Sequence, residues 1–89
     1  MARIINNIKG FKVIEISSIE MFAIGCGNIC DDCGEMSKNG YYVAVLNRWF
    51  CPACYADWAE HATNYATEHN ADGRVETKNF ERFKTLLGL

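Results

Sequence analysis

The 89-residue sequence lacks the features that direct a chain into a membrane or hold it on nucleic acid by charge alone. No stretch approaches the roughly 20 consecutive apolar residues that a helix needs to cross a bilayer. Asn6, Asn7 and Lys9 interrupt the start before any apolar run reaches the length of a secretory signal. The formal net charge of −2 disfavours non-specific attraction to nucleic acid or to an anionic membrane. We therefore expect a cytoplasmic protein with no membrane partner.

Repeats, linkers and low-complexity segments are also missing, and proline occurs once, at Pro52. The chain therefore predicts a single domain over residues 1–89. Its apolar fraction of 49% and charged fraction of 22% are typical of a folded globular protein. A domain of this size has a small core, and such domains often need a metal ion or disulfides for stability.

Cysteine, by contrast, is abundant for the length, with five residues. Four of them form two Cys-x-x-Cys pairs, Cys30 with Cys33 and Cys51 with Cys54, separated by seventeen residues. In a reducing compartment such pairs are metal ligands rather than disulfides. Two thiolates on a tight turn grip a metal from one side, and two pairs complete a tetrahedron with Zn–S distances of about 2.3 Å. We predict one structural zinc ion held by these four cysteines.

Iron is the chemical alternative to zinc at such a site. The sequences Cys33-Gly34 and Cys51-Pro52-x-Cys54 resemble the metal-binding turns of rubredoxins, which bind iron. Rubredoxins continue with glycine and a loop, whereas this chain continues with Tyr55 and an amphipathic segment, which favours zinc. The fifth thiol, Cys26, is expected to be a small apolar filler, with an alternative ligand or a reactive nucleophile as the other interpretations.

The first third of the chain predicts strands followed by a short helix. Residues 11–16 have the β-branched composition of a strand, and Ile4-Ile5 either pairs with it or lies loose. A short helical turn is expected over residues 19–24, with Ser17 or Ser18 as its cap.

A β-hairpin is expected over residues 41–50, with its turn at Asn47-Arg48. Alternation along the first strand places Tyr41, Val43 and Val45 on one face, and Tyr42, Ala44 and Leu46 on the other.

Two helices are expected after the hairpin. Apolar residues recur at helical spacing over 52–70, with Pro52 in the first turn. Residues 71–73 are predicted to break this helix, and a second helix over 76–87 is expected to bury Phe80, Phe83 and Leu87.

The order of cysteine turn, hairpin, Cys-Pro-x-Cys and helix resembles the treble-clef zinc fingers over residues 28–70. The segment 50–58 is similar to the closing half of a LIM domain, although a LIM domain has two zinc sites and this chain has ligands for one. The resemblance implies a small α+β treble-clef domain, with a short N-terminal β segment and a C-terminal helix. It suggests the kind of small stand-alone zinc finger found in bacteria or phages, and it implies no particular partner.

A catalytic role is not expected. Four thiolate ligands leave no open coordination position at which zinc could activate water. Treble clefs also occur in HNH-type nucleases, which need a histidine near the end of the hairpin and another on the following helix. The hairpin here has no histidine, and His61 and His69 are expected to be surface or packing residues. We therefore predict that the protein is not an enzyme.

The predicted role is binding. Residues 41–66 hold seven large aromatic side chains, more than one inner face can bury, so an exposed aromatic or apolar patch is expected. Such a patch indicates a protein partner, with self-association as the simplest case. The alternative is a nucleic-acid-binding regulator, whose cations would be Arg48, Arg74, Lys78 and Arg82. Glu76 and Glu81 interrupt that positive field.

Overall fold

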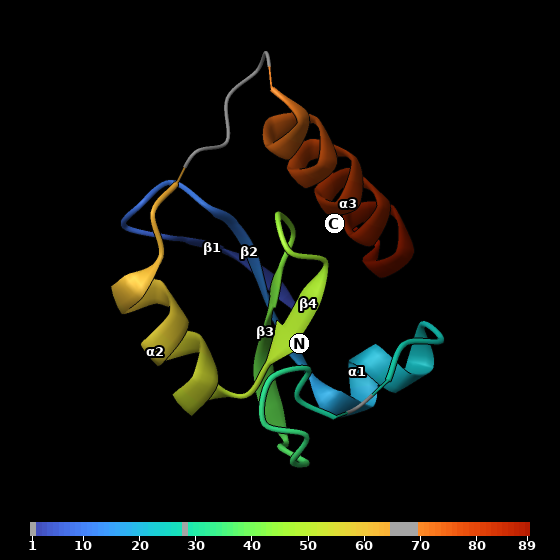
Figure 1. Cartoon of the computed structure of the whole chain (residues 1–89). Coiled ribbons are helices and arrows are strands. Elements are labelled where there is room, and N and C mark those ends of the chain that lie inside the picture. Colours follow the sequence, from blue (N-terminus) through green and yellow to red (C-terminus); the bar gives the residue numbers. More distant parts are fainter. Residues whose placement is uncertain (1, 28, 65–69) are drawn as a thin grey trace.

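The computed structural model describes residues 2–27, 29–64 and 70–89. Within these ranges it has a four-stranded sheet and three helices (Figure 1). In chain order the elements are β1 (Arg3–Asn6), β2 (Lys12–Ser17), α1 (Ser18–Ala23), β3 (Asn39–Val43), β4 (Arg48–Phe50), α2 (Pro52–His61) and α3 (Ala71–Leu87). No described helix is both long enough and apolar enough to cross a membrane.

The sheet is antiparallel, with the strand order β1-β2-β3-β4. Ile14 in β2 lies opposite Ile4 in β1 and Tyr42 in β3, and Tyr42 in turn lies opposite Trp49 in β4. The expected strand in the first third is therefore confirmed as β2, and the segment around Ile4 does pair with it. The expected hairpin is confirmed as β3 and β4, but the predicted turn at Asn47-Arg48 is wrong, because the turn lies at residues 44–47 and Arg48 already pairs with Val43 in β4.

The two faces of the sheet are covered by different helices (Figure 1). On one face, Tyr42, Ala44 and Trp49 share a core with Phe83 of α3 and Met21 of α1. On the other face, the core of Phe11, Val13, Cys30, Val43 and Phe50 packs against α2. The predicted alternation holds for Tyr41, Val43 and Val45, which belong to the second core, and for Tyr42 and Ala44, which belong to the first. It fails at Leu46, because β3 ends at Val43 and Leu46 lies in the turn, beside Val45 and Trp58.

Helix α1 begins with a reciprocal cap. Ser17 precedes the helix and accepts a hydrogen bond from the backbone N–H of Glu20 at 3.2 Å. The Glu20 carboxylate accepts from the Ser17 backbone N–H and hydroxyl, and from the backbone N–H of Ala2 at 2.7 Å. This Ser-x-x-Glu arrangement satisfies helix N–H groups that have no partner inside the helix. Of the two serines proposed as the cap, the structure selects Ser17.

The helix predicted over 52–70 is shorter, since α2 ends at His61 and residues 62–64 are not helical. The side-chain ammonium of Lys9 donates hydrogen bonds to the carbonyl oxygens of Glu60, at 2.9 Å, and Ala62, at 2.5 Å. The turn that carries Lys9 thus satisfies carbonyl groups at the helix end. Residues 65–69, which belong to the predicted helix and include Tyr65 and His69, lie outside the described part of the chain.

The predicted break at 71–73 is wrong, because α3 begins at Ala71. Asn70 caps the helix by accepting a hydrogen bond from the backbone N–H of Gly73 at 2.8 Å. Asp72 adds a negative charge to the first turn, where the helix dipole favours it. This cap outweighs the weak helix propensity of Gly73, which is buried. As expected, Phe83 is buried, and Phe80 and Leu87 pack against the same core.

Candidate metal centre

The four paired cysteines come together in the structure. Their sulfur atoms all lie within 4.8 Å of one another. The Sγ atoms of Cys33 and Cys51, from different pairs, are 3.9 Å apart. A tetrahedral metal with metal–sulfur distances of about 2.3 Å requires sulfur–sulfur distances of about 3.8 Å. These cysteines are therefore positioned to bind a metal ion.

The first pair is held by a tight turn. The backbone N–H of Gly34 donates a hydrogen bond to the carbonyl oxygen of Cys30 at 2.9 Å. The N–H of Cys30 donates in turn to the carbonyl oxygen of Glu35 at 3.0 Å. Gly34 has a φ of 75°, a left-handed conformation that glycine adopts without strain. A bridge between Ile29 and Met36 closes the base of this turn, which directs both thiols to the same side.

The second pair lies at the beginning of α2. Cys51 occupies the cap position in an extended conformation, Pro52 follows in the first turn, and the N–H of Tyr55 donates to the carbonyl of Cys51 at 2.9 Å. Proline fits this position because its missing N–H has no partner in the first turn anyway. The positive end of the helix dipole lies beside both thiols and stabilises thiolate charge.

The surroundings favour a thiolate at Cys30 and disfavour one at Cys33 and Cys54. Burial raises the pKa of Cys30, but the backbone N–H groups of Cys33, Cys51 and Asp32 outweigh it and lower the pKa to about 6. The N–H of Glu35 lowers the pKa of Cys33, yet the Cys30 sulfur leaves it raised overall. The pKa of Cys54 is also raised, chiefly by the Cys51 sulfur. Crowded sulfurs disfavour further negative charge, so a bound divalent cation supplies the compensation that four thiolates need.

The centre lies at the surface on one side. Cys30 is buried in the second core, Cys51 and Cys54 are half-buried, and Cys33 is exposed. A metal ion can therefore reach the site from solvent without unfolding the sheet. Cys26 is not part of the cluster, and it packs against the other core, the one shared by α1 and α3. This placement agrees with its expected role as a filler.

One residue that positions the site was not predicted in this role. Asp31 lies between the first two cysteines, and its carboxylate accepts a hydrogen bond from the backbone N–H of Trp49 at 2.8 Å. The N–H of Asp31 donates to the Trp49 carbonyl oxygen at 2.9 Å. These two bonds fasten the first cysteine turn to β4, two residues before Cys51. The sequence signal was an aspartate in a turn, which commonly accepts backbone hydrogen bonds.

The other residues predicted to act in binding are more dispersed. Tyr42, Trp49 and Phe50 are buried, and Tyr41, Tyr55 and Trp58 are partly buried against the second core. The predicted aromatic patch is therefore wrong for these six side chains, and Tyr65 lies outside the described residues. Apolar exposure occurs elsewhere, chiefly at Ile8, Ile19, Phe22 and Met36.

The predicted cations also divide between the two sides of the sheet. Arg48 lines a cavity beside α2 together with Asp32 and Asp57. Arg82 projects from α3, which covers the opposite face, and Glu76 is buried with its carboxylate accepting from the N–H of Lys12 at 3.1 Å. Arg48 therefore does not extend the row of cations on α3.

No family model, curated protein or solved structure matches the chain in comparisons with each of these groups. The site must therefore be interpreted from its own geometry. Four cysteine sulfurs at tetrahedral spacing indicate a structural metal-binding module in a small α+β protein.

Proposed function

We propose that the protein is a treble-clef zinc-binding module that acts by contacting another protein. The observation that supports the metal role is the cluster of four sulfur atoms within 4.8 Å. Four thiolates complete a tetrahedral coordination shell, so the ion holds the cysteine turn and α2 together and has no position for a substrate. The order of cysteine turn, β3–β4 hairpin and α2 supports the treble-clef assignment.

Zinc is preferred to iron because the second cysteine pair leads directly into a helix. Tyr55 and the rest of α2 come immediately after Cys54, and the Tyr55 ring stacks on Tyr41 with centroids 4.3 Å apart. The treble-clef resemblance implies zinc at a cysteine pair that begins a helix. Elemental analysis of the reduced protein tests this, with one zinc per chain and no visible colour expected. Iron in the purified protein, with the absorption of an iron–thiolate centre, would contradict it.

The proposed protein contact is supported by exposed apolar side chains on α1. Ile19 is 80% exposed and Phe22 is 71% exposed, and they lie three residues apart, one turn along the same side of the helix. Exposed aromatic residues of this kind are enriched where proteins bind one another. These exposed side chains support a contact on α1 rather than within residues 41–66, where the aromatic content of the sequence suggested it.

Self-association is the first form of this proposal to test, since symmetric dimers are the commonest oligomers. Light scattering over a range of concentrations should show a dimer that Phe22→Ser converts to a monomer. Leu86→Ser, at a half-exposed position on α3, serves as the control and should leave the dimer unchanged. A strictly monomeric protein would exclude self-association, and retention of a separate partner lost in Phe22→Ser would then be the supporting result. Salt-sensitive binding to DNA or RNA, weakened by Lys78→Ala, would instead favour the nucleic-acid alternative.

A further inference from the structure

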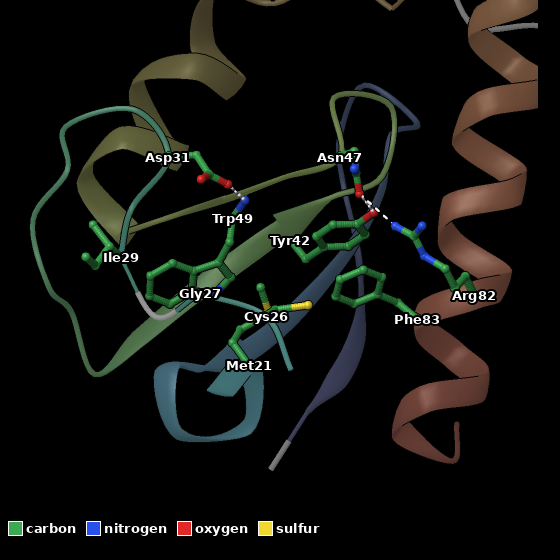
Figure 2. Close-up of a pocket in the computed structure, with 10 residues that line it drawn as sticks. All are labelled: Met21, Cys26, Gly27, Ile29, Asp31, Tyr42, Asn47, Trp49, Arg82 and Phe83. Carbon is green, nitrogen blue, oxygen red and sulfur yellow. Dashed lines mark hydrogen bonds between the residues drawn. The ribbon is translucent and has the colours of Figure 1, made fainter. Parts of the chain in front are cut away.

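A second cavity lies beside the core shared by α1 and α3, where four parts of the fold meet, and the cysteine turn contributes Asp31 to its lining (Figure 2). Its volume is about 250 Å³. Tyr42 and Trp49 of the hairpin, Phe83 of α3 and Met21 of α1 form its apolar walls. Typical pockets for drug-sized ligands have volumes of about 300–1,000 Å³, so this cavity suits a smaller molecule.

Arg82 places a positive charge at one end of the cavity. Its Nη2 donates a hydrogen bond to Asn47 Oδ1 at 3.0 Å, and its guanidinium lies 5.6 Å from the centre of the Phe83 ring (Figure 2). A guanidinium carries five N–H groups, so the bond to Asn47 orients it while other donors remain for a ligand. Because the Arg82 side chain is already oriented, it loses less conformational entropy when a ligand binds.

Asn47 links this cation to the hairpin. The hydroxyl of Tyr42 donates to the same Asn47 oxygen at 2.6 Å. Asn47 has a φ of 54°, a conformation that favours glycine or asparagine. Glycine would satisfy the backbone equally well but would lose both hydrogen bonds. The turn residue thus holds the tyrosine hydroxyl and the guanidinium side by side at the edge of the cavity.

The other end of the cavity carries the opposite charge. Asp31 lies there, and its carboxylate is held by the N–H of Trp49 (Figure 2). An anion bound in the cavity is therefore attracted to the Arg82 end and repelled from the Asp31 end. Between them, Tyr42 and Phe83 stack on each other at a 12° angle between their planes and, with Trp49, form a buried aromatic floor, while Cys26 and Ile29 are partly exposed in the lining.

We propose that this cavity binds an organic carboxylate that carries one apolar, preferably aromatic, group. The carboxylate accepts hydrogen bonds from Arg82, and the apolar group lies beside Cys26 and Ile29, over the buried aromatic floor. Bidentate pairing of guanidinium with carboxylate gives both the energy and the orientation. The carboxylate has two possible sources, a free small acid or the C-terminal residue of a peptide. This site is separate from the contact proposed on α1, and each can fail without the other.

The test uses two acids and one uncharged amide. Phenylacetate represents a free acid, N-acetylphenylalanine represents a C-terminal residue, and N-acetylphenylalanine amide is the uncharged control. Trp49 lines the cavity, so its fluorescence reports binding in a Trp58→Phe variant, in which it is the only tryptophan. Amide chemical shifts of Asn47 and Arg82 in the unsubstituted, metal-loaded protein give a second readout. Saturable binding of an acid at least tenfold tighter than binding of the amide is expected.

The matched protein variants are Arg82→Gln and Lys78→Gln. Both remove one positive charge from an exposed position on α3, but only Arg82 lines the cavity. Arg82→Gln should weaken acid binding about tenfold or more, and Lys78→Gln should leave it unchanged, with thermal melts confirming that both variants are folded. Tighter binding of phenylacetate than of N-acetylphenylalanine identifies a free acid as the source, and the reverse identifies a C-terminus. Equal binding of acid and amide, equal effects of the two variants, or no shift with either acid would overturn the proposal.

Discussion

The Asp31 carboxylate accepts a hydrogen bond from the backbone N–H of Trp49 at 2.8 Å, and the Asp31 N–H donates back to the Trp49 carbonyl at 2.9 Å. Asp31 follows Cys30, and Trp49 lies two residues before Cys51. These two hydrogen bonds therefore join the two cysteine pairs independently of any metal ion. Trp49 also carries this link into the core, since its indole N–H donates to the Ile16 carbonyl at 3.0 Å.

Replacing Asp31 should therefore weaken both folding and metal binding. Asp31→Ala leaves the N–H of Trp49 without its acceptor, which costs about 1–3 kcal/mol of unfolding free energy. Asp31→Asn keeps a carbonyl oxygen in place and should cost less than half as much. Denaturant unfolding and competition with a zinc chelator measure the two effects. Equal behaviour of the two variants would show that charge, rather than the hydrogen bond, is what Asp31 contributes.

Removal of the metal should unfold the region around it. Structural zinc contributes an apparent 10–16 kcal/mol or so in small zinc fingers, compared with about 5–15 kcal/mol for the net stability of a domain. A strong chelator should therefore abolish the ordered hairpin and α2, and Cys30→Ser should do the same. Circular dichroism before and after chelation measures this, with Cys26→Ser as the control because Cys26 lies outside the cluster. An unchanged thermal melt after complete metal removal would contradict the structural role.

The Tyr42 hydroxyl should ionise far later than an ordinary tyrosine. Burial raises its pKa to about 12, against the lowering influence of Arg82. The unfolded chain loses this proton near pH 10 and the folded chain keeps it, so stability should fall as pH rises from about 10 to 12. Absorbance titration of the metal-loaded protein should show a late component that disappears in Tyr42→Phe. Tyr41→Phe is the control, because Tyr41 is only partly buried. This variant should retain the late component.

The sequence predicted those features that depend on regular spacing. The two cysteine pairs come together because each needs only a tight turn, and the hairpin between them returns the chain to the same point. Alternation along β3 predicted which side chains face each core, since a strand has a fixed period of two.

Contacts between distant segments could not be predicted in this way. Helix α2 ends at His61 rather than at residue 70, and Lys9, more than fifty positions away in the sequence, donates to carbonyl groups at that end. The cavity beside Arg82 likewise requires four separate segments to meet. The start of α3 does carry a sequence signal, Asn70 followed by Asp72, which the predicted break at 71–73 did not take into account.

Gly40 provides a sharp test of how tightly the hairpin packs. A Cβ atom at this position would meet the backbone carbonyl oxygen of Phe50 and the ring of Trp49, far inside van der Waals contact. Trp49 is fully buried and its indole N–H is bonded to Ile16, so the ring cannot move aside cheaply. Gly40→Ala should therefore destabilise the protein by about 1–3 kcal/mol or more, the cost typical of an overpacked core.

The matched control is Gly27→Ala, where an added Cβ meets no atom within 4 Å. The backbone of Trp49 is hydrogen-bonded to Asp31, so displacement of the Trp49 ring in Gly40→Ala should also lower the affinity for zinc. Gly27→Ala should leave the zinc affinity unchanged. Thermal denaturation and chelator competition on both variants separate these effects. If Gly40→Ala loses stability but keeps full zinc affinity, the Asp31–Trp49 link does not transmit strain to the metal centre. If Gly40→Ala has the same melting temperature as the unsubstituted protein, the close approach of Gly40 to Trp49 and Phe50 does not hold.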